Sequence, residues 1–583
     1  MDVQTERLDD IPLLLRILAQ MGVQESIDAA YTPHGNHEGL SVGWLAVIWL
    51  TYIVSACDHR MATVQEWVMA RREALEQLIG QPLRETDFTD DRLADVLRYL
   101  SQDAVWHLIE AAISARTIRV YHLEPTTVRL DPTVGQVYHD ADEHTLFKVG
   151  RTKDDTYAVQ FKLVLAAMDP LGLPLAVDVV SGDQADDPLY VPIYQRLRQT
   201  LGRSGLLYIS DSKGGALETR ATMQWGGDFY LVPLAMVGDT PALLEEQLTR
   251  LWAGEVALTQ VYLPQNLPDD PEQAPDPDLA LAQGFEVTVE RRAVVEGQTV
   301  TWQERVLVVQ STAYAEAQRQ TLARRLRQAE AELLALTPPP GRGKRQFREE
   351  ADLQAAVEQI VTRYRVAGLL DITWERQESH RHVRGYGGRP ARIETQVRYQ
   401  VSVTRHEAAI EEAERQLGWR LYATNCPTER LPLTQAVWAY RDQYLVEANF
   451  ARLNGRRIGL LPLYVQRDDH ALGLIRLLTI ALRLLVTLEF VVRRGLAEQQ
   501  RTLSGLYAGN PKRRTARPTA ELLLDAFADI TLTTIRQPDG RLSRHLTPLT
   551  GVQETILELL GLSPAIYTAL LRSKAETRMA AVA

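Results

Sequence analysis

The chain has 583 residues and a formal net charge of -11, with 45% hydrophobic and 24% charged residues. These proportions are ordinary for a folded protein, and the length predicts roughly three to five domains. The acidic balance disfavours a globally basic nucleic-acid binder, although affinity for phosphates depends on local basic patches. Two cysteines, Cys57 and Cys426, argue against a disulfide framework or a cysteine-based zinc site, and they fit a reducing cytoplasm.

Neither end of the sequence nor its apolar runs indicate a membrane protein. The start, MDVQTERLDD, has no basic segment followed by an apolar core, so we expect no signal peptide. Val42 to Cys57 is short for a membrane span, and Ile475 to Val492 is interrupted by arginine and glutamate. We therefore predict that both runs are buried helices and that the protein has no membrane partner.

Residues 1–120 are expected to form a helical N-terminal domain. Helical spacing of apolar residues runs through four segments, which are Ile11–Met21, Ser41–Cys57, Thr63–Leu78 and Asp90–Arg116. Two interpretations stay open. The domain is either a helical bundle without chemistry of its own or a DNA-end recognition domain whose helix enters a groove.

The period of the apolar residues changes in residues 121–240. Short β-prone runs alternate with one helix, in the order Thr127–Leu130, Gln160–Ala167, Leu173–Val180, helix Asp187–Leu201, and Leu206–Ser210. A strand, a hairpin, a helix and a strand predict a mixed α/β layer. We expect this segment to be the first part of an α/β catalytic core.

Two aspartates in this segment directly follow apolar strands. Asp131 comes after Thr127–Leu130, and Asp211 comes after Leu206–Ser210. Ligands and reactive groups often collect at strand ends in open α/β sheets. The alternative is that both aspartates are turn formers, which are also common after strands.

A third carboxylate, Glu447, follows Asp211 only after more than two hundred residues. That separation is too long for one connection in a compact fold. We therefore predict an insertion domain at 241–415, built from strands and long helices, before a second core segment at 416–500. Residues 501–583 are predicted to be a basic linker and a helical C-terminal tail.

Glu447 is expected to lie on a helix over residues 434–453. Tyr440, Gln443, Glu447 and Asn454 follow one another at intervals of three, four and seven residues. At 3.6 residues per turn these positions form one polar stripe. The stripe is either a solvated surface or a face that presents the Glu447 carboxylate to a catalytic centre.

Two aspartates and a glutamate supply oxygen ligands that suit hard cations such as Mg²⁺, which retains waters and also binds substrate phosphates. Two such ions about 4 Å apart activate the attacking oxygen and stabilise the leaving oxygen of an in-line phosphoryl displacement. Asp131, Asp211 and Glu447 together are therefore candidates for a two-metal site.

Three motifs carry a resemblance to a known family. LDPT at 130–133, YISDSKGG at 208–215 and YRDQYLVEANFARLN at 440–454 resemble the DDE transposases of bacterial insertion sequences, in the IS-four-like superfamily. The resemblance implies a ribonuclease-H-like core with a β-rich insertion before the glutamate. That family has Arg and Lys where this chain has Gln443 and Asn454, and Arg441, Arg456 and Arg457 lie nearby in the sequence.

Softer matches flank these motifs. GRTKDDTYAVQ at 150–160, FTDDRLADVL at 88–97 and LTGVQETILELLGL at 549–562 are similar to one subgroup of the same family. The resemblance therefore extends over most of the chain. It implies an α/β fold with flanking all-α N-terminal and C-terminal regions.

The implied activity is metal-dependent cleavage of DNA at the element's ends, followed by joining of the freed 3'-hydroxyl to a target. Asp131, Asp211 and Glu447 would be the catalytic residues and the ligands of two Mg²⁺ ions, with Mn²⁺ as a substitute. The implied nucleic-acid contacts are Tyr440, Arg441, Gln443, Arg452, Asn454, Arg456, Arg457, Lys153 and Lys213. The partners would be double-stranded DNA and a second copy of the chain, at the nucleoid in a bacterial cytoplasm. The alternative is a catalytically silent, transposase-derived, sequence-specific DNA-binding protein.

Overall fold

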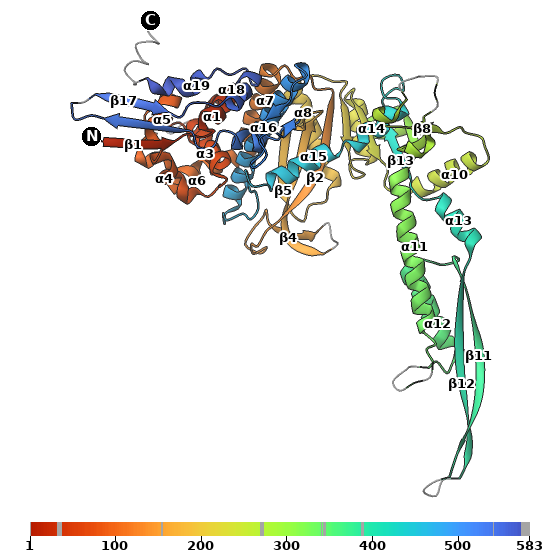
Figure 1. Ribbon diagram of the computed structural model, residues 1–583. Coiled ribbons are helices and arrows are strands. Elements are labelled where there is room, and N and C mark those ends of the chain that lie inside the picture. The colour runs from red at the N-terminus through yellow and green to blue at the C-terminus, as the bar shows by residue number, and fades with distance from the viewer. Residues whose placement is uncertain are drawn as a thin grey trace.

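The computed structural model describes residues 2–31, 38–152, 156–268, 273, 275–339, 341, 346–385, 390–539 and 541–572. Figure 1 shows a broad body and a narrow arm that projects from one end of the body's main sheet. The arm consists of residues 312–415, and the body contains the remaining described residues. Helices surround a large mixed sheet, which confirms the predicted α/β class.

The central sheet contains ten strands within the described residues. Their order is β3-β4-β2-β6-β7-β13-β10-β9-β8, and β5 pairs with β4. The strands are β2 (Thr127–Gln136), β3 (Lys148–Arg151), β4 (Tyr157–Met168), β5 (Leu173–Ser181), β6 (Leu207–Ser210), β7 (Phe229–Pro233), β8 (Thr259–Val261), β9 (Ala282–Val295), β10 (Gln298–Ser311) and β13 (Trp419–Thr424).

An antiparallel part and a parallel part make up the first half of this sheet, which consists, apart from the short β3, of β2, β4, β5, β6 and β7. β2, β4 and β5 pair antiparallel, as the predicted hairpin requires. Helix α8 (Tyr190–Leu201) then leads to β6, which lies parallel to β2, and α9 (Leu217–Trp225) leads to β7, which lies parallel to β6. The spatial order of these strands is therefore β5-β4-β2-β6-β7.

The strands predicted for the insertion domain continue the sheet of the core. β13 pairs antiparallel with β7 on one side and with β10 on the other. A buried polar group secures the extension, because Glu304 on β10 accepts hydrogen bonds from Tyr230 Oη at 2.6 Å and Arg291 Nε at 2.8 Å. Glu304 also pairs with Arg220 of α9. The predicted domain boundary at residue 241 thus falls between β7 and β8, which belong to the same sheet.

One hydrophobic core joins both ends of the chain to the first part of the sheet. The helices that contribute to it are α1 (Ile11–Gln20), α2 (Val23–Ala30), α3 (Val42–Ala56), α4 (Val64–Met69), α5 (Arg72–Ile79), α6 (Asp90–Leu100), α7 (Asp103–Val120), α8, α15 (Tyr444–Leu453), α16 (Asp468–Glu498), α17 (Ala520–Asp525), α18 (Gly551–Leu559) and α19 (Ala565–Thr568). The segment predicted as one helix, Asp90–Arg116, is therefore two, α6 and α7.

Helix α16 lies at the centre of this core. Its apolar run is interrupted by charges that find partners inside the protein: Arg483 donates to Glu110 Oε1 at 2.6 Å, and Arg476 pairs with Asp103. Among the described helices, α16 alone is long and apolar enough to cross a membrane. The helices Val42–Ala56 and Met61–Met69 meet the same criteria only when this bent pair is counted as one span. The apolar window of α16 is 94% buried, which confirms the prediction of a buried helix.

The predicted all-α character of the two terminal regions is wrong at five described strands, which are β1, β14 (Leu503–Ser504), β15 (Arg514–Thr515), β16 and β17. β1 (Asp2–Arg7) pairs antiparallel with β16 (Thr531–Arg536), and β16 pairs with β17 (Leu542–Leu546). The DVQTER sequence of β1 lacks the alternation of apolar and polar residues that indicates a strand. Its pairing partner lies more than five hundred residues further along, where local sequence patterns cannot reveal it.

The arm has a small core of its own. Helices α11 (Thr312–Ala335) and α12 (Glu350–Tyr364) pack on the base of a ribbon formed by β11 (Leu370–Val383) and β12 (Arg392–Arg405), which α13 (Glu407–Arg415) follows. Figure 1 shows the ribbon extending beyond the two helices. The other elements are α10 (Thr240–Trp252), α14 (Leu433–Arg441), β14 (Leu503–Ser504) and β15 (Arg514–Thr515).

Candidate active site

Asp131 and Asp211 are neighbours on adjacent strands. The parallel register of β2 and β6 pairs Leu130 with Ser210, so the two aspartates occupy the next position of each strand. Neighbouring strands lie about 4.8 Å apart, and residues in register point to the same face of the sheet. Both aspartates are half-buried, whereas Leu130 and Ser210 are buried. Asp131 lies within β2, which continues to Gln136, whereas Asp211 directly follows β6. A role of the two carboxylates as metal ligands stays a prediction.

Three donors surround one oxygen of Asp211. Tyr190 Oη donates to Asp211 Oδ1 at 2.5 Å, and the backbone N–H groups of Lys213 and Gly214 donate to the same atom at 3.0 and 3.4 Å. Burial raises the pKa of Tyr190 far above its usual range, and the charges of Asp211 and Asp131 add to this effect. The phenol thus keeps its proton, and it fixes the orientation of the Asp211 carboxylate.

Tyr440, which lies far along the sequence from Asp131 and Asp211, is close to the same two aspartates in the fold. Its pKa is raised, first by burial and the neighbouring Tyr422 and then by the charges of Asp211 and Asp131. Its ring meets that of Tyr422 on β13 edge to face, with centroids 4.9 Å apart. The last turn of α14 is therefore held against the sheet, with the Tyr440 phenol within electrostatic reach of both carboxylates.

The predicted helix over 434–453 is two helices. α14 ends at Arg441 and α15 begins at Tyr444, with Asp442 and Gln443 between them. Across this break the backbone bonds span three residues, for example Leu445 N to Asp442 O at 3.0 Å and Val446 N to Gln443 O at 3.1 Å. Such bonds tighten the helix, so the predicted polar stripe is not one continuous helical face.

Glu447 lies in the first turn of α15, and its side chain is exposed. The buried face of α15 rests on the strand that carries Asp131. Asn449 Nδ2 donates to Gly172 O at 2.6 Å, at the turn between β4 and β5. Further along, Phe450 lies across a small cavity from Thr133 of β2. Glu447 therefore belongs to a helix that lies against β2.

The three predicted metal ligands do not form one cluster. Among the residues that the structure describes, no three His, Cys, Asp or Glu side chains come close enough together to hold a metal ion. Asp131 and Asp211 are brought together, and Glu447 stands apart on α15. The oxygen donors of the aspartate pair suit a hard cation such as Mg²⁺.

Two predicted DNA contacts are instead engaged in ion pairs inside the body. Arg457 is 7% exposed, and it pairs with Asp10 Oδ2 at 3.0 Å and with Asp525. Arg452 pairs with Glu489, and its Nε lies 3.1 Å from Glu521 Oε1. The predictions for Arg452 and Arg457 are therefore wrong, because both guanidinium groups connect the α15 region to other parts of the body. Sequence spacing beside Glu447 could not reveal these distant partners.

The remaining predicted contacts differ in position. Arg441, Lys213, Asn454 and Arg456 are exposed, and Lys213 Nζ lies 3.9 Å from Asp187 Oδ1. Gln443 is half-buried, and neither polar atom of its amide has a hydrogen-bond partner among the described residues. Lys153 lies outside the described residues. Contact of any of these side chains with DNA stays a prediction.

A polar cavity of about 730 Å³ opens beside Asp211. Lys213 and Lys162 contribute cations to its lining, and Lys162 Nζ lies 2.5 Å from Asp186 Oδ1. Pro132 and Thr133, which follow Asp131, line it as well. Nothing in the sequence motifs indicated Lys162 or Tyr190 as part of this site, because each belongs to an element without a recognisable motif.

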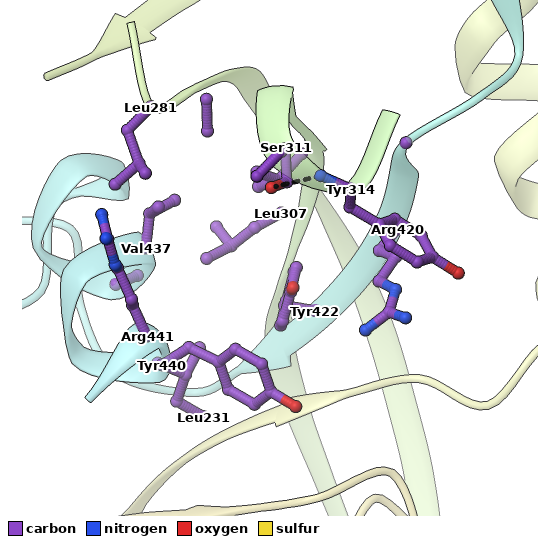
Figure 2. A pocket seen from close by; sticks show the side chains of 15 residues that line it. Leu231, Leu281, Leu307, Ser311, Tyr314, Arg420, Tyr422, Val437, Tyr440 and Arg441 are labelled. Carbon is purple, nitrogen blue, oxygen red and sulfur yellow. Dashed lines mark hydrogen bonds between the residues drawn. The ribbon is translucent and has the colours of Figure 1, made fainter. Parts of the chain in front are cut away.

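A second cavity, of about 340 Å³, lies on the other side of Tyr440 (Figure 2). Its lining is mainly apolar, with Leu231 and Leu307 from the sheet and Val437 from α14. Tyr440 and Arg441, at the end of α14, also border it.

No protein-family model matches the chain, and no curated protein matches its sequence. Among solved structures, the chain is similar to one described as "Cryo-EM structure of piggyBac transposase synaptic complex with hairpin DNA (SNHP)". The TM-score is 0.35 at 8% identity, over 98% of this chain and 86% of that chain. A likeness this weak carries no argument, so the functional assignment rests on the geometry and motifs of the chain.

Proposed function

We propose that this protein is a DDE transposase that cleaves DNA at the ends of its element and joins the freed 3'-hydroxyl to target DNA. The observation that carries the proposal is the adjacency of Asp131, which lies within β2, and Asp211, which directly follows the parallel strand β6. The strand order β5-β4-β2-β6-β7 supports a ribonuclease-H-like core around them. The proposed partners are double-stranded DNA and a second copy of the chain, in a bacterial cytoplasm.

In this proposal Asp131 and Asp211 hold two Mg²⁺ ions, for which Mn²⁺ can substitute, and Glu447 completes the set of ligands. Bound Mg²⁺ would supply the charge that activates the attacking oxygen and stabilises the leaving oxygen. Tyr190 orients Asp211 by donating to Oδ1. Lys213, exposed in the cavity beside Asp211, is positioned to neutralise DNA phosphates, and Arg441 is a second exposed cation at the end of α14.

Glu447 does not cluster with Asp131 and Asp211 in the described structure. It can therefore join them as a metal ligand only after a rearrangement. We propose that binding of DNA moves α15 towards the aspartates about the break at Asp442 and Gln443. The buried Gln443 amide, which lacks a described partner, favours this location, because an unsatisfied amide stabilises the observed state poorly. In this proposal DNA binds first, and the three carboxylates come together afterwards.

The decisive test compares Asp211→Asn with the unaltered chain on DNA that carries the inverted repeats flanking the coding region. We expect nicking in Mg²⁺ to fall to background while DNA affinity is retained, because Asn keeps the shape and loses the charge that holds the cation. Asp187→Asn is the matched control, since Asp187 lines the same cavity, and it should nick normally. Cleavage retained by Asp211→Asn would overturn the assignment.

A second candidate is a catalytically silent DNA-binding protein derived from a transposase. The separation of Glu447 from the aspartate pair favours it, as do Gln443 and Asn454 at positions where the family has cations. This candidate predicts tight binding to element-end DNA with no nicked product in either Mg²⁺ or Mn²⁺. Metal-dependent nicks on a denaturing gel would remove it.

A further inference from the structure

The outer half of the β11–β12 ribbon is exposed on both faces. The two strands pair without interruption from Leu370 with Arg405 to Val383 with Arg392. At the base, Tyr399 and Val401 are buried against the arm helices. Every residue from Glu375 to His382 is exposed. A two-stranded ribbon with no buried face is at best marginally stable in water, so a surface of this kind fits a partner that covers it.

The charge of this outer ribbon, described residues 375–385 and 390–395, is concentrated towards its end. Between Glu378 and Glu394 the sequence contains four arginines and two histidines and no acidic residue. The arginines are Arg381, Arg384, Arg389 and Arg392, of which Arg389 lies outside the described residues. The chain as a whole carries a net charge of -11, so this concentration of cations is local. A basic patch on an acidic protein favours a polyanionic partner.

A second basic segment belongs to the same arm. GRGKRQFR at 341–348 connects the end of α11 to the start of α12, and it contains four cations and no acidic residue. The two basic segments are separated in sequence by α12 and β11. The arm thus carries two basic stretches of sequence without acidic residues, in addition to the arginines of its helices.

The strand register places two arginines on one face of the ribbon. Arg381 pairs with Glu394 and Val383 pairs with Arg392, so Arg381 and Arg392 share one face. His380 and His382 alternate with them and lie on the other face. A ribbon inserted into a groove can contact a phosphate backbone through the face that carries the arginines.

We infer that the outer ribbon is a DNA-contact surface, separate from the aspartate pair, that enters a major groove of the bound DNA. The inference rests on the proposed function and adds to it a second point of contact. The major groove is about 12 Å wide and admits a two-stranded ribbon. A protein partner fits less well, because the centres of protein interfaces are depleted of charge.

The length of the arm sets where this contact falls. Helix α11 has 24 residues, which corresponds to about 36 Å at 1.5 Å per residue. The ribbon continues past the far end of α11 in Figure 1. At 3.4 Å per base pair, α11 alone corresponds to about ten base pairs. The outer ribbon therefore contacts DNA at least about one helical turn from the site of cleavage.

The test removes three ribbon cations from the full chain. Arg381→Ala, Arg384→Ala and Arg392→Ala are combined, and binding to a mixed-sequence duplex is measured by fluorescence anisotropy at several salt concentrations without divalent metal. Because each lost phosphate contact lowers the salt slope by about 0.9, we expect a decrease of up to about 2.7 and a loss of affinity of about tenfold or more.

The matched control is Arg319→Ala, Arg324→Ala and Arg327→Ala, which removes three exposed arginines from α11. It should bind within about twofold of the unaltered chain, because only contacted phosphates contribute to the salt slope. Equal losses in both triple variants, or no loss in the ribbon variant, would overturn the inference. If the ribbon variant binds normally while the unaltered chain nicks DNA, the inference fails and the proposed function stands.

A cross-link identifies the partner directly. Ser379 is exposed on β11, so Ser379→Cys can carry a photoactivated cross-linker. We expect a protein–DNA adduct that the unaltered chain, with Cys57 and Cys426 only, does not form. An adduct with a second protein chain in place of DNA would overturn the inference. An unaltered chain that neither binds nor nicks DNA would remove the proposed function itself.

Discussion

The body and the arm differ in how their stability is built. In the body, one hydrophobic core unites residues from α1 to α19, and charged groups such as Arg483 and Glu110 are paired inside it. In the arm, a small core joins α11, α12 and the base of the ribbon, and the outer ribbon has no core. Contacts distant in sequence therefore stabilise the body, whereas contacts between neighbouring elements stabilise the arm.

Because of this difference, we expect substitutions in the body and in the arm to affect stability differently. A change in the body affects packing that many segments share, so it should lower the free energy of unfolding of the whole body. A change in the arm should remain local, because the arm follows β10 and precedes β13 and meets the body near its base. Four predictions sharpen this contrast.

The largest loss of stability is expected for Glu304→Ala. This change leaves Arg220 and Arg291 without their shared carboxylate in a buried site. Breaking a buried ion pair on one side costs about 3–5 kcal/mol. Chemical denaturation should show this loss in the main transition, whereas the exposed Glu290→Ala on β9 should change it by less than about 0.5 kcal/mol. A small effect of Glu304→Ala would mean that β9 and β10 are only loosely joined to the core.

Matched leucine truncations compare the two cores. Leu478→Ala in α16 creates a cavity in the body and should cost about 2–5 kcal/mol in the main unfolding transition. Leu333→Ala in α11 removes an equally buried side chain from the arm. We expect it to speed proteolysis between α11 and α12 while the main transition stays in place. A shared shift in that transition would show that body and arm unfold together.

Asn449→Ala should have an intermediate effect. The change removes the donor that holds α15 to Gly172 O and leaves that buried carbonyl without this bond, at a cost of about 1–3 kcal/mol. Because α15 carries Glu447, nicking should fall by more than DNA affinity falls. Asn454→Ala, at the exposed end of the same helix, is the control for general effects on α15. Equal activity in both variants would show that Asn449 does not position Glu447.

The smallest effect on stability is expected when the outer ribbon is removed. Residues 377–398 can be replaced by an Asn-Gly turn that joins Arg376 to Tyr399, which are paired in the ribbon. Calorimetry should show a change in the main transition below about 0.5 kcal/mol, since the removed segment is largely exposed. A large destabilisation would show that the ribbon packs on the body in solution.

Local patterns define the apolar strands beside Asp131 and Asp211, so the sequence predicted these strands. The parallel register of β2 and β6 places the two aspartates side by side, although β2 continues past Asp131 to Gln136. The long apolar segment of α16 likewise had few alternatives to burial. The α/β class follows from the same alternation of strands and helices.

Features that depend on distant partners could not be predicted in this way. Arg457 looked like a cation beside the catalytic helix, yet its partners Asp10 and Asp525 lie at opposite ends of the sequence. The break after Arg441 depends on how α14 packs at Tyr422, which helical periodicity does not contain. The continuation of the core sheet into β10 depends on pairing with β13, across the entire arm.

The pairing of β1 with β16 has a consequence for synthesis of the protein on the ribosome. Residues Asp2–Arg7 emerge early, whereas their partner Thr531–Arg536 emerges only after more than five hundred further residues. During translation the edge of β1 is therefore left without this neighbour, and α16 likewise waits for the late helices α17 and α18. The packing of the body is thus completed only after β16 has been made, so the two strands cannot pair before translation reaches that segment.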